Sequence, residues 1–207
     1  MRLQAQIERM KRVILALPVL LLLAPASQAA APAGWQTYHD ARGFSVSFPR
    51  DWKANPDYYD DDYPTDGDPP PRLLALALVP SGDLDPGTTL SSSSVRITIL
   101  PLPSFRNDCA AWSFIAEPPP DYSSSFDIDT PDYAHLIGGD PAGWYTYEDY
   151  VWRISTAPCV GVHYTIGYYA DDSDQAKSVK PFDRTNLLKL LDSIRATVVL
   201  DPAHKAD

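Results

Sequence analysis

The sequence predicts an α+β domain, an antiparallel sheet with helices packed on its faces. Three observations support this class. Several short runs alternate apolar and polar residues, as half-buried strands do. Gly and Pro separate the strand-like runs of the second half and mark turns between them. Near the C-terminus, residues 182–194 repeat large apolar side chains at helical spacing, which predicts an amphipathic helix that packs on the sheet.

The first 29 residues are expected to be a signal peptide. Basic residues, including Arg2 and Arg12, precede an apolar run over residues 13–23, and small residues follow it. Cleavage is expected after Ala29, with cleavage after Ala31 as the alternative. This run is shorter than the roughly 20 apolar residues that span a bilayer, so we expect no stable membrane anchor after cleavage. Residues 30–207 should therefore form a mature protein in the periplasm or outside the cell.

The mature chain is expected to be one acidic domain. The whole sequence has 17 Lys and Arg against 27 Asp and Glu, a net charge of -10, and its basic leader is removed on export. The remaining chain of about 175 residues suits a single domain. Because nucleic acids are dense in negative charge, an acidic surface argues against nucleic-acid partners.

Cys109 and Cys159 are the two cysteines of the chain. An exported domain meets an oxidising compartment, and only one intramolecular pairing is open to two cysteines. We therefore expect a structural disulfide between them. Free thiols and an intermolecular bridge are the alternatives.

The first half should open with a hairpin. Residues 35–38 and 44–48 flank a turn that contains Gly43, and the second run places Phe44, Val46 and Phe48 on one face. Residues 55–71 follow, where six aspartates lie among prolines and tyrosines without apolar periodicity. This segment is expected to be a long, mobile acidic loop.

Two more strands and a short helix are expected before the second half. The continuously apolar run 73–79 predicts a central strand, and the alternation over 95–99 predicts a half-buried one. Spacing of three residues from Cys109 to Ile115 is typical of a short helix, with Asn107 or Asp108 as its cap.

The second half is expected to be an antiparallel meander followed by the final helix. Asp183 is a suitable N-cap for that helix. The strand candidates, separated by Gly and Pro, are residues 133–137, 144–147, 150–156 and 160–169.

The chain resembles the PsbP-like superfamily. The residues that carry the resemblance are Tyr38, the Gly-Phe-Ser-Val-Ser-Phe-Pro segment 43–49, Trp52, the turn 139–142 and the Leu-Leu-Asp-Ser-Ile-Arg segment 190–195. The resemblance implies an α+β sandwich and a binding or assembly role rather than catalysis, and it carries over no functional residue. The acidic loop and the two cysteines depart from the common pattern.

Two acidic clusters could in principle bind a cation. One lies between Asp60 and Asp68, and the other consists of Asp127, Asp129 and Asp132. Neither has the spacing of an EF-hand loop, and no histidine pair among His39, His135, His163 and His204 has zinc-site spacing. We expect no metal ligands and no cofactor.

No catalytic residue is assigned from the sequence. Cys159 and His163 could form a thiolate pair, but the expected disulfide would consume the thiol. Glu148 and Asp149 are adjacent carboxylates; neighbours on a strand point to opposite faces, and such a pair more often occupies a turn. The chain lacks the Gly-x-Ser-x-Gly, phosphate-loop and dinucleotide-binding patterns.

Aromatic residues crowd the later strands, where they could bind a sugar ring or a peptide. Trp144, Tyr147 and Trp152 are the candidates for this ligand surface, although packing inside a sheet explains such residues equally well. The function expected is that of a non-enzymatic accessory or binding domain of the bacterial envelope, whose partner is another envelope protein or a small ligand. A periplasmic or secreted hydrolase with an unrecognised site is the alternative.

Overall fold

A computed structural model describes residues 31–59, 74–101, 109–114, 123–140, 142–170 and 173–201. The expected signal peptide, most of the acidic loop, the Asn107 or Asp108 cap and His204 lie outside these residues. The chain divides into two compact units, Met1–Ala30 and Ala31–Asp207, and the structure described below is that of the second.

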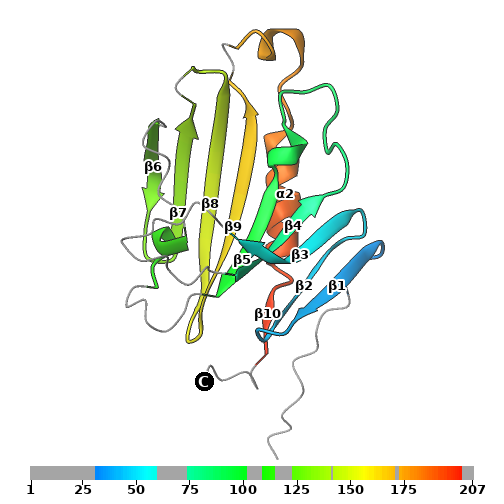
Figure 1. Cartoon of the computed structure of the whole chain (residues 1–207), viewed down its shortest axis with the longest axis vertical. Helices are drawn as coiled ribbons and strands as arrows, with labels where there is room; N and C mark the ends of the chain where they lie inside the picture. The colour runs from blue at the N-terminus through cyan, green and yellow to red at the C-terminus, as the bar shows by residue number, and fades with distance from the viewer. Residues whose placement is uncertain are drawn as a thin grey trace, which may run out of the picture. The chain divides into compact units, whose positions relative to one another are not determined.

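The larger sheet is antiparallel and has seven strands in the order β3-β4-β5-β9-β8-β7-β6. Its last four strands along the chain form the expected meander, in which β6, β7, β8 and β9 pair consecutively (Figure 1). The bounds are β3 Trp52–Tyr59, β4 Leu74–Pro80, β5 Arg96–Pro101, β6 Ser123–Asp129, β7 Tyr133–Gly139, β8 Tyr145–Thr156 and β9 Cys159–Tyr169.

The smaller sheet has three antiparallel strands in the order β1-β2-β10. Its strands are β1 Trp35–Asp40, β2 Phe44–Pro49 and β10 Val199–Leu200. The expected hairpin is confirmed, because β1 and β2 pair around a turn in which Gly43 has a φ of 86°. Such a positive φ suits glycine, which has no Cβ to clash.

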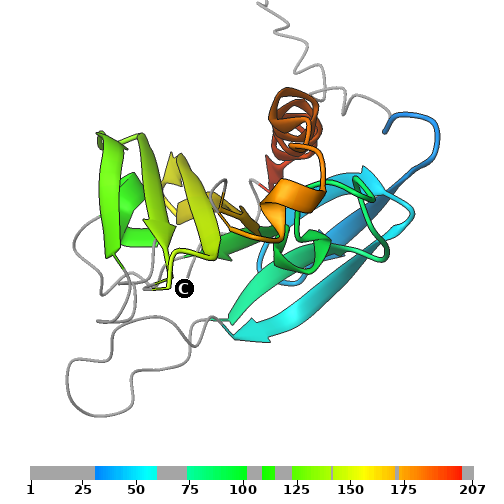
Figure 2. The ribbon, with the colours of Figure 1, turned by 90° about the horizontal axis from the view of Figure 1, so that it is seen from above.

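Helix α2, Arg184–Arg195, is the expected final helix. The Asp183 carboxylate accepts a hydrogen bond from the Asn186 amide and so caps the first turn, as expected. Leu187, Leu191 and Ile194 are buried against the sheet, and the Tyr164 hydroxyl donates to the Leu191 carbonyl over 2.9 Å. Figure 2 shows α2 and the β1–β2 hairpin on the same side of the seven-stranded sheet.

Two apolar clusters lie on opposite faces of that sheet. The larger one fills the helix face, defined as the face that packs on α2 and the three-stranded sheet, and includes Val46, Leu78, Ile97, Val162 and Tyr164. The smaller one lies on the disulfide face and includes Ala75, Leu100, Phe114 and Val151, with Cys109 and Cys159 packed against it. Strand β4 is therefore covered on both faces, as its apolar run predicts.

The expected α+β class is wrong. The protein is mostly β, with two antiparallel sheets that pack as a β-sandwich, and α2 is the one α-helix of the described residues. The second expected helix, near Cys109, is a 3-10 turn over Ala111–Phe114. Three strands that the sequence reading left out, β3, β6 and β10, raise the strand content instead.

Two boundaries also differ from expectation. Residues 55–59, expected in the acidic loop, belong to β3, which pairs with β4 across a bulge between Asn55 and Tyr58. The runs 144–147 and 150–156 are parts of one strand, β8, which continues through Glu148 and Asp149. Polar residues in the middle of a buried strand need partners, and both carboxylates have them.

Candidate functional site

Glu148 and Asp149 lie in the middle of β8 and are almost wholly buried, with exposed fractions of 1% and 7%. Successive strand residues point to opposite faces, so Glu148 lies on the helix face and Asp149 on the disulfide face. Burying a carboxylate is costly unless hydrogen bonds or opposite charges compensate it. Each of the two is the centre of its own polar network.

The Glu148 carboxylate is held by groups from three strands and the helix. It accepts a hydrogen bond from the Tyr168 hydroxyl at 2.6 Å and another from the Tyr150 hydroxyl. The Arg184 guanidinium forms an ion pair with it, and His135 Nε2 lies 3.5 Å away. The carboxylate thus ties β7, β8 and β9 to the first turn of α2.

His135 extends this network to β6. Its Nδ1 lies 3.1 Å from the Asp127 carboxylate, and its ring stacks on Tyr150 with ring centres 4.2 Å apart. Burial raises the pKa of Tyr150, and the neighbouring Tyr133, Tyr168 and Asp127 raise it further. The Tyr150 hydroxyl therefore keeps its proton and remains a donor to Glu148 at neutral pH.

Asp149 meets a histidine on the other face. His163 Nε2 lies 2.6 Å from the Asp149 carboxylate, which also accepts a hydrogen bond from Thr165 at 3.0 Å. A histidine held by an aspartate could act as a general base. The Thr165 hydroxyl lies 3.4 Å from His163 Nε2, but it also donates to Asp149, and Cys159 is in a disulfide.

The three expected ligand-surface residues do not come together. Trp152 lies on the helix face, where the Arg195 guanidinium is 4.5 Å from its ring centre and Tyr133 packs beside it. Tyr147 points to the other face, where its ring covers Gly138. Trp144 precedes β8 and is 62% exposed, and its amide is held by the Asp140 carboxylate at 2.8 Å.

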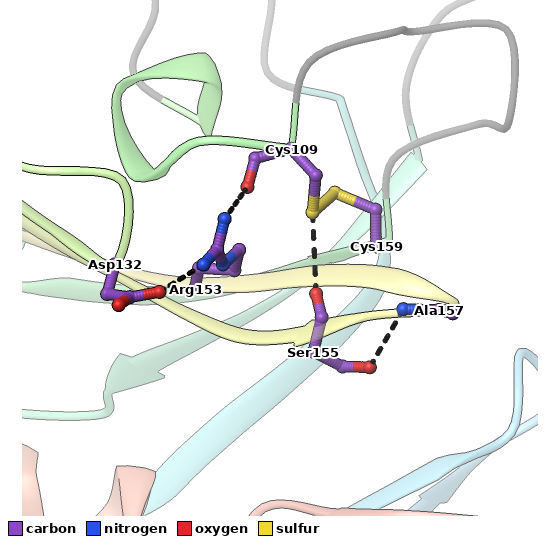
Figure 3. The surroundings of a disulfide bond; sticks show 6 residues. All are labelled: Cys109, Asp132, Arg153, Ser155, Ala157 and Cys159. Carbon is purple, nitrogen blue, oxygen red and sulfur yellow. Dashed lines mark hydrogen bonds and ion pairs between the residues drawn. A yellow bond between two sulfur atoms is a disulfide. The ribbon is translucent and has the colours of Figure 1, made fainter.

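The expected disulfide between Cys109 and Cys159 is present (Figure 3). Arg153 supports it, because its guanidinium donates to the Cys109 carbonyl at 3.0 Å and pairs with Asp132. The 3.4 Å approach of Cys109 Sγ to the Ser155 carbonyl is a contact rather than a hydrogen bond, since a disulfide sulfur carries no proton. Disulfides of this kind persist in oxidising compartments.

A cavity of about 370 Å³ lies between α2 and the preceding loops. Its polar groups are already engaged, because Asp85 accepts a hydrogen bond from the Asp183 amide and Asp183 accepts from Asn186. These contacts fix the start of the helix. The lining residues are Leu84, Asp85, Leu90, Phe182, Asp183, Asn186, Leu187 and Leu190.

Exposed apolar side chains concentrate on β6 and β7. Phe126 is 49% exposed, Ile128 40% and Ile137 38%, and we call these three residues the docking arm. Ile137 pairs with Glu148 and Ile128 with His135, which puts both on the helix face, whereas Phe126 pairs with Leu136 on the other. The sequence reading missed this surface, although Phe126 to Asp129 alternates apolar and acidic residues.

The remaining sequence candidates are separated in space. Asp127 pairs with His135, Asp132 pairs with Arg153, and His39 is exposed on β1. Among the described residues, no three His, Cys, Asp or Glu side chains lie close enough together to hold a metal ion. Within the same part of the chain, no helix has both the length and the apolar character needed to cross a membrane.

No protein-family model, no curated protein and no solved structure matches the chain. The geometry described above therefore carries the functional argument.

Proposed function

We propose that the protein is an exported, non-enzymatic accessory domain of the bacterial envelope that binds another envelope protein through the docking arm. The observation that carries the proposal is the exposure of Phe126, Ile128 and Ile137 on two neighbouring strands. Ile128 and Ile137 are exposed on the helix face and Phe126 on the other face of the same sheet edge, and exposed apolar residues gathered at one edge are typical of protein interaction sites. The disulfide supports export, because such bonds are rare in the cytosol.

The network beneath the arm supports the same function. Asp127 on β6, His135 on β7 and Glu148 on β8 link three successive strands, and Arg184 anchors them to α2. Strands linked in this way hold the backbone of the arm in place before a partner binds. A preorganised surface of this kind lowers the entropic cost of association.

Site-specific photo-cross-linking tests the proposal. A photoreactive benzoylphenylalanine replaces Phe126 or Ile137 in cells that export the protein, and the same residue at Val199 is the control, because Val199 is exposed to a similar extent on β10. We expect one discrete protein adduct from positions 126 and 137 and none from 199. Equal adducts at all three positions, or none from the arm, would contradict the proposal.

Export is tested on the same cells. The protein should be recovered from the periplasm or the medium with an N-terminus near Ala30. Intact protein that retains Met1 in the cytosol would reject this part of the proposal.

A further inference from the structure

Strand β6 forms one edge of the seven-stranded sheet and pairs with β7 alone among the described strands (Figure 1). Residues 125–129 are all exposed. An edge strand carries a row of unpaired main-chain donors and acceptors, which another extended chain can pair with. The accessible backbone of β6 therefore lies beside the apolar side chains of the docking arm.

The opposite edge is protected in the way that natural sheets protect their edges. Strand β3 carries Lys53 and Pro56, and a bulge interrupts its pairing between Asn55 and Tyr58. A charged lysine, a proline and a bulge each discourage the addition of another strand. Strand β6 has a bulge between Phe126 and Ile128 but contains neither Lys nor Pro. Of the two edges, β6 is the more open to strand addition.

Charge selects the kind of chain that fits this edge. Asp127 and Asp129 are exposed on β6, and neither β6 nor β7 contains Lys or Arg. A second copy of the protein would bring the same two aspartates against its own, and like charges on paired strands are destabilising. The net negative charge of the chain adds to this repulsion. A basic segment from a different protein is the favourable occupant.

We propose that β6 accepts an extended basic segment of the partner protein as an eighth strand of the sheet. Alternate apolar residues of that segment would pack beside Ile128 on the helix face, and its Lys or Arg side chains would meet Asp129 on the other face. The inference rests on the proposed function, since it specifies how the docking arm holds its partner.

Three labelled ten-residue peptides test the mode of binding to the mature, disulfide-bonded protein. One alternates Lys and Val, the second alternates Glu and Val, and the third is the Lys and Val peptide with every second amide methylated along one edge. By fluorescence anisotropy, the basic peptide should bind more than about tenfold more tightly than either control. The methylated peptide cannot donate the main-chain hydrogen bonds that a paired strand requires.

Charge reversal locates the site. Asp129→Lys should weaken binding of the basic peptide about three- to tenfold, because it replaces an attraction with a repulsion. Asp51→Lys makes the same change in net charge at an exposed residue next to β3, and it should leave binding unchanged. Strand addition would be overturned if amide methylation left the affinity unchanged, or if both charge-reversal variants weakened binding equally. It would also be overturned if no peptide bound at millimolar concentration.

The outcomes also separate this inference from the proposed function. Cross-links from Phe126 without binding of the basic peptide would reject strand addition and leave the docking arm as a side-chain surface. Peptide binding without any cross-link from the arm would reject the proposed function instead.

Discussion

Glu148 and Asp149 are neighbours in β8, yet their carboxylates lie on opposite faces of the sheet, and each is buried beside a histidine, His135 for Glu148 and His163 for Asp149. Among the described residues, the hydrogen-bond and ion-pair partners of the two carboxylates do not overlap. One strand thus carries two separate polar networks, and the one around Glu148 links β6, β7 and β9 to the helix.

Neutralising Glu148 should destabilise the protein. Glu148→Gln removes the charge that faces Arg184, and we expect a loss of about 1 to 3 kcal/mol in the free energy of unfolding, measured by urea denaturation. Arg184→Ala should cost less, because Arg184 is about half exposed. If Glu148→Gln were as stable as the parent, the carboxylate would have no structural role.

The two networks should act independently. Because Glu148 and Asp149 share no described partner, the double variant Glu148→Gln with Asp149→Asn should cost the sum of the two single changes to within about 0.5 kcal/mol. A larger coupling energy in this cycle would show that the two faces communicate through β8.

Alkaline conditions should weaken the contact between sheet and helix at Tyr164. Burial raises the pKa of its hydroxyl well above 10.0, despite the opposing effect of the Arg195 charge. A pKa that is higher in the folded state gives stability that is present below pH 10 and lost as the pH rises through the folded value. The free energy of unfolding should therefore fall above pH 10, and it should fall less steeply in Tyr164→Phe. Parallel curves would contradict this assignment.

The absence of a side chain at Gly161 leaves room for the ring of Phe114 on the disulfide face. A Cβ at Gly161 would lie 2.6 Å from that ring, which is itself buried. Gly161→Val should cost about 1 to 3 kcal/mol by overpacking. Adding Phe114→Leu should recover part of the loss, whereas an unchanged loss would place the strain elsewhere.

The disulfide should contribute strongly to stability. It links residues 50 apart in sequence, and removing such a bond typically costs about 2 to 5 kcal/mol. Reduction and the Cys109→Ser substitution should each lower the melting temperature, and the two decreases should be similar. The double variant with Cys159→Ser should be insensitive to reductant. Two reactive thiols in the unfolded, unreduced protein would contradict the bond.

The sequence predicted elements whose local signals agree with their packing. Residues 44–48 alternate cleanly, and the helix after Asp183 has both a cap and a buried stripe. The disulfide followed from two cysteines in a chain that was expected to be exported. The strand and the helix depend on nearby residues, and the disulfide depends on a single available pairing. They could therefore be predicted with little knowledge of the rest of the fold.

The errors arise where distant contacts decide the structure. Pro56 in β3 and the three serines in β6 argue against strands, yet both segments lie at sheet edges, where proline and polar residues are tolerated. Glu148 and Asp149 were not expected inside a strand, because their partners come from β7, β9 and α2. The α+β class failed for the same reason, since missed edge strands changed the balance of the fold.

The docking arm was missed because its three residues belong to two separate segments of the sequence, and two of them alternate with aspartates. Phe126 and Ile128 alternate with aspartates that suggested a cation site, and Ile137 belongs to a separate strand. Only the pairing of β6 with β7 brings the three side chains to one edge. The solvent exposure of these three side chains then identifies them as a surface. Sequence patterns report the exposure of single apolar residues poorly.

Amide hydrogen exchange on the complex with the cross-linked partner is the most direct test of the central claim, that β6 is the edge on which the partner docks. The account predicts that amides of residues 123–129 exchange more slowly in the complex than in the free protein, while those of residues 52–57 in β3 keep their rates. Unchanged exchange along β6, with protection elsewhere on the surface, would contradict it.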